Sequence, residues 1–200
     1  MGKPGGEVKF TTQPLTSANF ADLEAIFNAR GCSIARACWC MAYRKTGGNE
    51  WGSVEWAKIK QKNRSGLKSL ADKGAHVGLI GYRDGVPVGW ISFGPREDFA
   101  RLANSTIMKP VDDQAVWSII CFVVPSEYRG EGVARQMLDA AIAFCRKKKV
   151  KLVEAYPVDK EGRSADTSLW FGTKSMFDDA GFKEVARRKP TRPVVRLKVA

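Results

Sequence analysis

The sequence predicts an α/β protein of the α+β kind, and three observations lead to that fold class. Residues 115–150 have the pattern of a buried strand, a sharp glycine turn and an amphipathic helix. The tripeptide Arg83-Asp84-Gly85 separates two apolar runs, which indicates a hairpin. Two stretches with the apolar spacing of helices precede that hairpin. No linker rich in Pro, Gly or Ser divides the 200 residues, so we expect a single domain with one core.

The segment 115–150 carries the strongest local signal. Its strand is rich in Val, Ile and Phe and ends at Pro125, because proline cannot continue a hydrogen-bond ladder. The helix that follows has an apolar stripe formed by Val133, Ala134, Met137, Leu138, Ala141, Ile142 and Cys145. Between strand and helix, Gly130 and Gly132 lack a Cβ, so a ligand can approach the main chain. The unpaired N–H groups of the first helical turn then predict an anion site.

The other elements are expected in the order strand, two helices, two strands before this segment, and strand, helix, strands after it. Strands are expected at 7–15, 76–82, 86–93, 151–158 and after Gly181, and helices at 17–30, from Ser53 onward, and near 170–180. The first helix has Phe20, Leu23, Ile26 and Phe27 on one face, and the second has Trp56, Ile59, Leu67 and Leu70. Gly66 is expected to break the second helix.

Composition and charge narrow the class of protein. Hydrophobic residues make up 44% of the chain, and no apolar run is long enough for a membrane span or a signal core. Five cysteines without a signal sequence indicate reduced thiols and a cytoplasmic location. The net charge of +12 favours anionic partners. Nucleic acid is not expected, because no aromatic-interleaved RNA signature accompanies the basic stretches.

The glycine turn also carries a family resemblance. It has neither the Gly-x-Gly-x-x-Gly of dinucleotide folds nor the spacing of a P-loop. It resembles motif A of the GNAT superfamily of acetyl-CoA-dependent N-acetyltransferases through Val123, Pro125, Tyr128, Arg129, Gly130, Gly132 and Ala134. The order of elements matches the GNAT fold along nearly the whole chain. The resemblance therefore implies a mixed, mostly antiparallel sheet of six to seven strands flanked by about four helices.

The resemblance also implies a cofactor site. Main-chain N–H groups from Arg129 to Ala134 would hold the pyrophosphate of coenzyme A, and Arg135 could reach a phosphate oxygen. The main chain of the preceding strand, which would part from its neighbour, would bind the pantetheine and the thioester. The implied cofactor-binding residues are Cys121, Phe122, Val123, Val124, Arg129, Gly130, Glu131, Gly132, Val133, Ala134 and Arg135. Glu127 stands where the superfamily prefers Gln or Arg.

The usual general acid of the superfamily is missing. Many members carry a tyrosine four residues before the glycine of the Gly-Phe pair that ends the last helix, and here that position is Phe177. Glu154, Tyr156 and Asp159 are candidate catalytic residues, because they lie where the fold would place the acceptor cleft. Each also has an ordinary interpretation as an exposed carboxylate, a half-buried aromatic ring or a turn residue. The only histidine, His76, is expected to be structural.

Cys32, Cys38 and Cys40 form the most unusual cluster outside the glycine turn. Zinc favours four thiolate or imidazole ligands, and no fourth ligand follows at a recognisable spacing, so no metal is expected. We expect small buried residues in the connection between the first two helices, which in GNAT enzymes overlies the acceptor. Trp39 and Tyr43 in this connection are candidate substrate-binding residues.

These observations predict transfer of the acetyl group of acetyl-CoA directly to an amine, with a small-molecule acceptor favoured. Acetylation of a protein or ribosomal component is an alternative, and so is a non-catalytic GNAT relic that senses CoA or binds nucleic acid. Within the single domain 1–200, residues 1–75 would provide the first strand and acceptor-side helices, 76–182 the acetyl-CoA core and 183–200 the terminal strands. The acceptor, the acyl-chain preference and the oligomeric state stay open.

Overall fold

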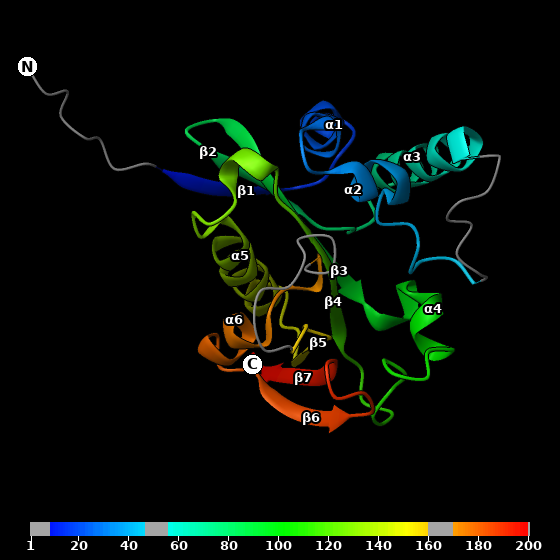
Figure 1. Ribbon diagram of the computed structural model, residues 1–200, viewed down its shortest axis with the longest axis vertical. Coiled ribbons are helices and arrows are strands. Elements are labelled where there is room, and N and C mark those ends of the chain that lie inside the picture. The colour runs from blue at the N-terminus through cyan, green and yellow to red at the C-terminus, as the bar shows by residue number, and fades with distance from the viewer. Residues whose placement is uncertain (1–8, 47–55, 160–169, 200) are drawn as a thin grey trace, which may run out of the picture.

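In the part of the chain that the structure describes, all strands join one seven-stranded sheet in the order β1-β2-β3-β4-β5-β7-β6. The computed structural model describes residues 9–46, 56–159 and 170–199. The strands are β1 Phe10–Pro14, β2 Leu79–Arg83, β3 Val86–Pro95, β4 Trp117–Val123, β5 Leu152–Ala155, β6 Lys183–Arg187 and β7 Pro193–Lys198. The helices are α1 Phe20–Asn28, α2 Ser33–Cys38, α3 Trp56–Asp72, α4 Ala100–Ala103, α5 Val133–Lys147 and α6 Lys174–Asp179 (Figure 1).

The sheet is mixed and mostly antiparallel, as the sequence predicts. Neighbouring strands are antiparallel except β4 and β5, which run parallel and are connected through α5. The predicted hairpin is present between β2 and β3. Asp84 and Gly85 at its tip have φ angles of 50° and 83°, which is the left-handed backbone that a two-residue hairpin turn requires.

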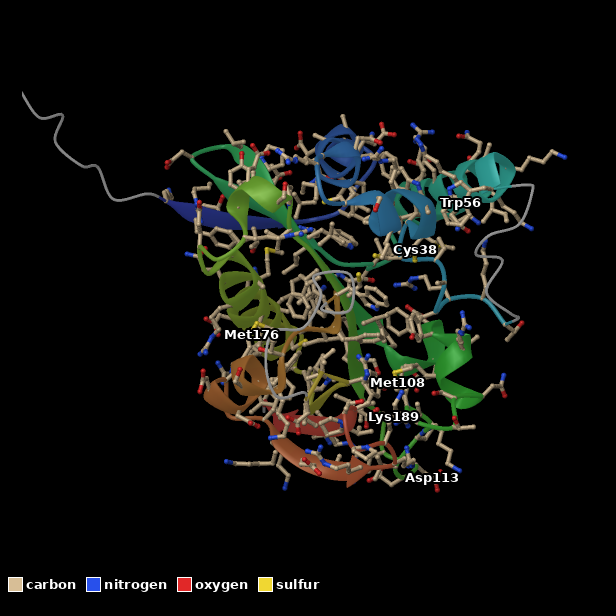
Figure 2. All side chains as sticks on the ribbon, viewed as in Figure 1. Cys38, Trp56, Met108, Asp113, Met176 and Lys189 are labelled. Atoms are coloured by element: carbon tan, nitrogen blue, oxygen red, sulfur yellow. The ribbon has the colours of Figure 1, made fainter. Side chains whose placement is uncertain are left out.

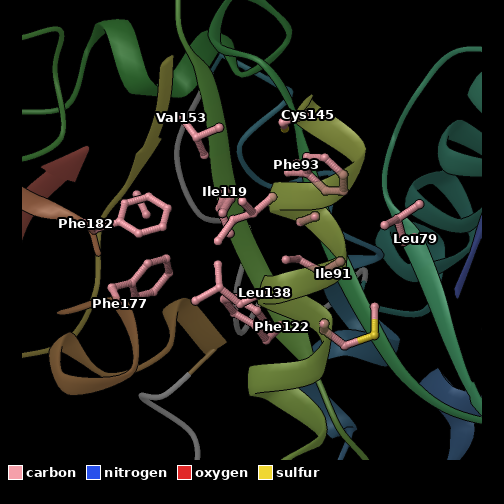
Figure 3. Close-up of a cluster of buried hydrophobic side chains, with 14 of the residues drawn as sticks. Leu79, Ile91, Phe93, Ile119, Phe122, Leu138, Cys145, Val153, Phe177 and Phe182 are labelled. Atoms are coloured by element: carbon pink, nitrogen blue, oxygen red, sulfur yellow. The ribbon is translucent and has the colours of Figure 1, made fainter. Parts of the chain in front are cut away.

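Helices α5 and α6 cover one face of the sheet. The stripe predicted for α5 is buried there, with Met137, Leu138 and Cys145 fully enclosed. Figure 3 shows Phe177 and Phe182 packed together beside Ile119 and Phe122 of β4. This core fixes α5, and with it the glycine turn, against the centre of the sheet.

Two glycines let the start of α5 approach the sheet closely. A Cβ at Gly81 would lie 2.4 Å from Met137 Sδ, and one at Gly89 would lie 2.8 Å from Val133 Cγ1. Both distances are shorter than real carbon contacts, so a side chain at either glycine would force Met137 or Val133 of α5 to shift. The position of the helix N-terminus therefore depends on glycines in strands that are distant in sequence.

Helices α1, α2 and α3 cover part of the other face. The four predicted apolar residues of α1 are all buried in this cluster. In α3, Leu67 is buried and Leu70 packs against the cluster, while Trp56 is exposed. The expected start of this helix at Ser53 lies outside the described residues.

The expected break at Gly66 is wrong. Helix α3 runs through Gly66 without interruption. A Cβ at this position would lie 3.2 Å from the methyl group of Met41. The glycine therefore provides room for a side chain of the α2–α3 connection, and packing outweighs its low helix propensity.

Two short helices were not predicted. Helix α2 lies in the connection between α1 and α3, and α4 follows a 3₁₀ turn at Arg96–Asp98. Around α4, Phe99, Leu102, Ile120, Tyr156, Phe171 and Val194 form a third buried cluster. In Figure 1, α4 lies on the opposite side of β3 and β4 from α5. Short helices of four to six residues carry too little periodic signal for sequence patterns to find.

None of the helices in the described part of the chain has the length and apolar character that a membrane crossing needs.

Candidate active site

The glycine turn before α5 has the geometry of an anion cradle. Gly130 and Gly132 both have φ of 78°, a left-handed backbone that suits glycine. A Cβ at either position would meet no heavy atom of the described residues within 4 Å, so the space in front of the turn is open. The first hydrogen bond of the helix runs from Gln136 N–H to the Gly132 carbonyl at 3.0 Å. The N–H groups of Val133, Ala134 and Arg135 precede this bond and so have no acceptor within the helix. The turn therefore fits a phosphate group.

The charged side chains around the turn are engaged with the protein. Arg129 donates from Nε to the Val124 carbonyl at 3.0 Å and from Nη2 to the Gly31 carbonyl at 2.8 Å, so it ties the turn to the end of β4 and to the loop after α1. Glu131 forms an ion pair with Arg83 of β2. These contacts hold the turn in shape and partly neutralise its one carboxylate.

Arg135 turns away from the glycines. Its Nε lies 3.1 Å from both carboxylate oxygens of Asp139, one helical turn further on, and its Nη2 donates to the Asp179 carbonyl at 3.4 Å. An exposed pair of this kind is worth about 0.3–0.5 kcal/mol. The two negative charges of a pyrophosphate could therefore attract the Arg135 side chain away from Asp139. The role of Arg135 as a phosphate ligand stays a prediction.

Strands β4 and β5 part in front of the turn. In the described residues they pair at Trp117 with Val153, Ser118 with Glu154 and Ile119 with Ala155, and β4 then continues without β5 but still paired with β3. We call this point, between Ile119 and Ala155, the fork. On the other side of β4 the register with β3 shifts, so that Ile120 forms a bulge between Ile119 and Cys121. The main chain of residues 121–124 lies beyond the fork, where the sequence predicts the pantetheine contacts.

Glu154 has structural partners. Its side chain has no solvent exposure, and it accepts hydrogen bonds from Tyr156 Oη at 2.6 Å and Arg196 Nε at 2.8 Å. Arg96 Nη1 lies 3.5 Å away, and Arg196 continues to Asp112 with an N–O distance of 2.6 Å. The carboxylate is thus surrounded by donors. A role for Glu154 as a general base stays a prediction, and this network does not favour it.

Tyr156 and Asp159 are also engaged. Burial and the neighbouring Glu154 carboxylate raise the pKa of the Tyr156 hydroxyl well above its usual value, and Ser118 Oγ lies 3.1 Å from it. Asp159 accepts a hydrogen bond from Arg187 at 2.7 Å, and its own N–H donates to the Thr191 carbonyl at 3.0 Å. Glu154 and Tyr156 lie together, whereas Asp159 belongs to the surface beside β6.

The two predicted substrate-binding residues differ in position. Trp39 is only 1% exposed, stacks on Phe20 at 6.0 Å between ring centroids and contacts the tilted ring of Phe27 at 5.0 Å, so it belongs to the core under α1. Tyr43 packs edge-on against Phe171 at 5.6 Å, and the Arg101 guanidinium lies 5.8 Å from its ring centroid.

Arg192 borders the same region. It lies 4.4 Å from the Phe171 ring centroid and donates to the Tyr156 carbonyl at 3.1 Å. Arg192 and Phe171 therefore join Tyr43 in a wall beside the fork. The sequence did not indicate these two residues, because they approach Tyr43 only in the folded chain.

Cys40 lies in the buried cluster beneath α1, α2 and α3, and Cys121 of β4 packs against that cluster. Trp90 Nε1 donates a hydrogen bond to Cys40 Sγ at 3.2 Å, and the Cys121 thiol donates to the Phe122 carbonyl at 3.7 Å. Figure 2 shows Cys38 where α2 ends. Cys32 belongs to the same cluster, and burial raises the pKa of its thiol. No set of three or more His, Cys, Asp or Glu side chains within the described ranges is arranged to hold a metal ion.

The chain was compared with protein families and with known proteins. Residues 32–165 match the model of the acetyltransferase (GNAT) family. Comparison with curated protein sequences found no match.

Solved structures show the same fold at low identity. PaiA N-acetyltransferase from Thermoplasma acidophilum, in complex with coenzyme A, is 14% identical with a TM-score of 0.52, covering 95% of this chain and 99% of that one. YncA from Salmonella typhimurium, with its cofactor acetyl-CoA, is 16% identical with a TM-score of 0.52, covering 96% and 94%. Ribosomal-protein-alanine N-acetyltransferase from Brucella melitensis is 18% identical with a TM-score of 0.51, covering 94% and 99%.

The family match covers more than half of the chain, and the fold agrees with it. The predicted sheet, the glycine turn before α5 and the fork occur together within or beside the matched residues. The chain therefore belongs to the GNAT family of acetyltransferases.

Proposed function

We propose that this protein transfers the acetyl group of acetyl-CoA directly to an amine, and that the acceptor is a small molecule. The observation that carries the proposal is the open glycine turn at the N-terminus of α5, which follows the part of β4 that runs beyond the fork. Main-chain N–H groups from Arg129 to Ala134 would hold the pyrophosphate. The main chain of Cys121 to Val124 would hold the pantetheine. The five cysteines are all free thiols in the structure, as expected for a protein that acts in the reducing cytoplasm.

When bound, acetyl-CoA would supply an activated thioester at the fork. The protein would contribute chiefly position, since alignment of two reactants can lower a barrier by several kcal/mol. Phe177 has no proton to donate, and Glu154 and Tyr156 are committed to their own network. We therefore propose that the amine arrives neutral and that the protein adds little acid–base catalysis. The rate should then rise with pH up to the pKa of the acceptor amine.

The wall beside the fork suggests the acceptor. Tyr43 and Phe171 offer an edge-on aromatic pair, and Arg192 lies over Phe171 with a guanidinium whose pKa is lowered by burial. Aromatic surface suits an acceptor with an apolar body. Trp39 is left out of this wall, because the α1 core encloses it.

A protein or ribosomal acceptor is the second candidate. The net charge of +12 favours an acidic docking partner. The similar fold of the ribosomal-protein-alanine N-acetyltransferase from Brucella melitensis also supports this candidate. A screen that follows thiol release with small amines and with peptides bearing different N-termini separates the two, because the preferred class should give the higher kcat/KM.

The coenzyme site is tested with a matched pair of glycine variants. Gly130 and Gly74 both have left-handed φ and open surroundings, but Gly74 lies after α3, far from the turn in sequence. Both Gly130→Val and Gly74→Val should lose about 1–2 kcal/mol of stability through backbone strain. Only Gly130→Val should lose acetyl-CoA binding in calorimetry. Equal binding by both variants, or no binding by the parent protein, would refute the cradle.

A further inference from the structure

Three arginines lie over aromatic rings of the third buried cluster, the one around α4. The distance from guanidinium carbon to ring centroid is 4.6 Å for Arg44 over Phe99, 5.8 Å for Arg101 over Tyr43 and 4.4 Å for Arg192 over Phe171. Phe99 and Phe171 belong to this cluster, and Tyr43 packs against it. The wall beside the fork is therefore apolar in its rings and positively charged at its margin. Such a surface suits a ligand that has an apolar body and a negative group.

The charge of Arg192 has no carboxylate partner among the described residues. Its side chain donates to the Tyr156 carbonyl at 3.1 Å and lies over the Phe171 ring. The carboxylate of Asp159 pairs with Arg187 instead. Arg192 is half-buried, and burial lowers the pKa of its guanidinium. Because a guanidinium has five N–H donors, most of those of Arg192 are left for a ligand.

Arg192 also lies close to the place where the thioester is expected. Tyr156, whose carbonyl it binds, comes one residue after Ala155 of the fork. On β4, Cys121 lies two residues beyond the fork and packs against the same cluster as Tyr43. The Arg192 guanidinium therefore borders the point at which β4 and β5 part.

We propose that the acceptor carries a carboxylate close to its amine, and that Arg192 binds this carboxylate while Tyr43 and Phe171 contact an apolar side chain. The acceptor is then an amino acid with an apolar side chain. This proposal rests on the proposed function, because it names the acceptor of the same site. The planar guanidinium offers paired N–H donors that match the two oxygens of a carboxylate. The carboxylate has to be near the amine, because Arg192 is bound to the main chain one residue beyond the fork.

The carboxylate takes no part in the bond changes. The amine nitrogen forms the new amide bond with the acetyl carbon, the C–S bond breaks and the thiolate of coenzyme A leaves. The amine proton passes through water to that thiolate. Arg192 thus acts by holding the acceptor in line, which is the kind of contribution that alignment makes to a rate.

Binding is measured first, by calorimetry on the full chain with and without coenzyme A. 3-Phenylpropionate and 3-phenylpropionamide share their ring and chain, but only the first has a carboxylate. The parent protein should bind the carboxylate at least about tenfold more tightly than the amide, and Arg192→Gln should lose this preference. No binding of the carboxylate, equal affinity for both compounds, or an unchanged preference in Arg192→Gln would overturn the proposal.

Arg188→Gln is the matched control. Arg188 also donates to main-chain carbonyls, but these belong to Ile107, Lys109 and Pro110, in the segment before β4. This variant loses the same kind of contact and should keep the preference for the carboxylate. If Arg192→Gln does not fold, Arg192→Lys provides the test, because lysine keeps the charge but lacks the paired donors and should retain only part of the preference.

The rate of thiol release from acetyl-CoA tests the acceptor itself. Phenylalanine, leucine and methionine are each compared with their amides, with kcat/KM referred to the neutral amine. At least one acid should exceed its amide about tenfold or more in the parent protein. Arg192→Gln should lower kcat/KM for that acid about ten- to hundredfold and leave the amide nearly unchanged. Amides that react as well as all three acids would overturn the proposal. If the parent protein binds no acetyl-CoA, the proposed function fails, and the 3-phenylpropionate titration still decides whether Arg192 binds a carboxylate.

Discussion

Glu154 of β5 and Arg196 of β7 stand directly opposite each other in the sheet and form a buried ion pair, with 2.8 Å between Oε2 and Nε. Their side chains are 0% and 7% exposed. Arg196 also binds Asp112, whose pKa it lowers to about 2. The carboxylate that the sequence offered as a candidate base is thus the centre of a network that joins β5, β7 and the segment before β4.

Removing the Glu154 carboxylate should lower the stability of the protein more than it lowers the rate of acetyl transfer. Glu154→Ala leaves the buried guanidinium of Arg196 without this partner, so we expect the free energy of unfolding in urea to fall by about 3–5 kcal/mol. Asp159→Ala is the control, because solvent screens the exposed pair of Asp159 with Arg187, so its loss should change the stability much less. A Glu154→Gln protein that is fully stable yet inactive would instead restore Glu154 as the general base.

The close contact of Gly89 with Val133 predicts a compensating pair of substitutions. Gly89→Ala places a methyl group 2.8 Å from Val133 Cγ1, so we expect overpacking to cost about 1–3 kcal/mol and to displace the glycine turn. Acetyl-CoA binding should weaken with it. Val133→Ala removes the clashing atom, and the double variant should recover stability and binding relative to Gly89→Ala. Strictly additive effects in this double-mutant cycle would argue against the contact.

A substitution at Phe177 tests whether the protein lacks a general acid for the leaving thiolate. Its ring contacts Phe122, on the part of β4 beyond the fork, with centroids 6.1 Å apart. Phe177→Tyr should therefore add a phenol that can protonate the leaving thiolate, and we expect a higher kcat and a new alkaline limb in the pH–rate profile. Phe182→Tyr is the control within the same cluster, 5.0 Å from Phe177, and should only destabilise. Identical profiles for the parent and both variants would place Phe177 away from the reacting sulfur.

His76 should make the fold sensitive to acid. Its ring is stacked between Trp117 and Phe144, with centroids 5.1 and 4.5 Å away. Burial, with Arg44 and Lys148 nearby, lowers its pKa to about 4. Since the unfolded chain binds this proton near pH 6.5, the unfolded state holds more protons between pH 6.5 and 4, and stability falls as the pH drops through that window.

We expect this loss to be about 1–3 kcal/mol, reduced from the full shift because the ring is partly exposed. His76→Phe keeps the stacking and removes the titration. The difference between parent and variant in urea unfolding should therefore change between pH 6.5 and 4 and be constant above pH 7. A constant difference throughout would show that His76 titrates normally.

Local patterns predicted most of the elements. The hairpin followed from Asp84 and Gly85, the stripe of α5 from its spacing, and the glycine turn from the absence of side chains where a helix begins. Such features depend on the backbone preferences of a few consecutive residues. Gly66 was misjudged for the same reason, because its helix propensity is visible in the sequence while the nearby Met41 side chain is not.

The sequence by itself determined the family, the order of the strands and longer helices and the place of the glycine turn, because each is written in residues that are close along the chain. Only the tertiary structure decided what the polar and reactive side chains do. It placed Glu154 opposite Arg196 and enclosed Trp39, since charge pairing and burial arise between residues that meet only when the sheet and its helices pack together.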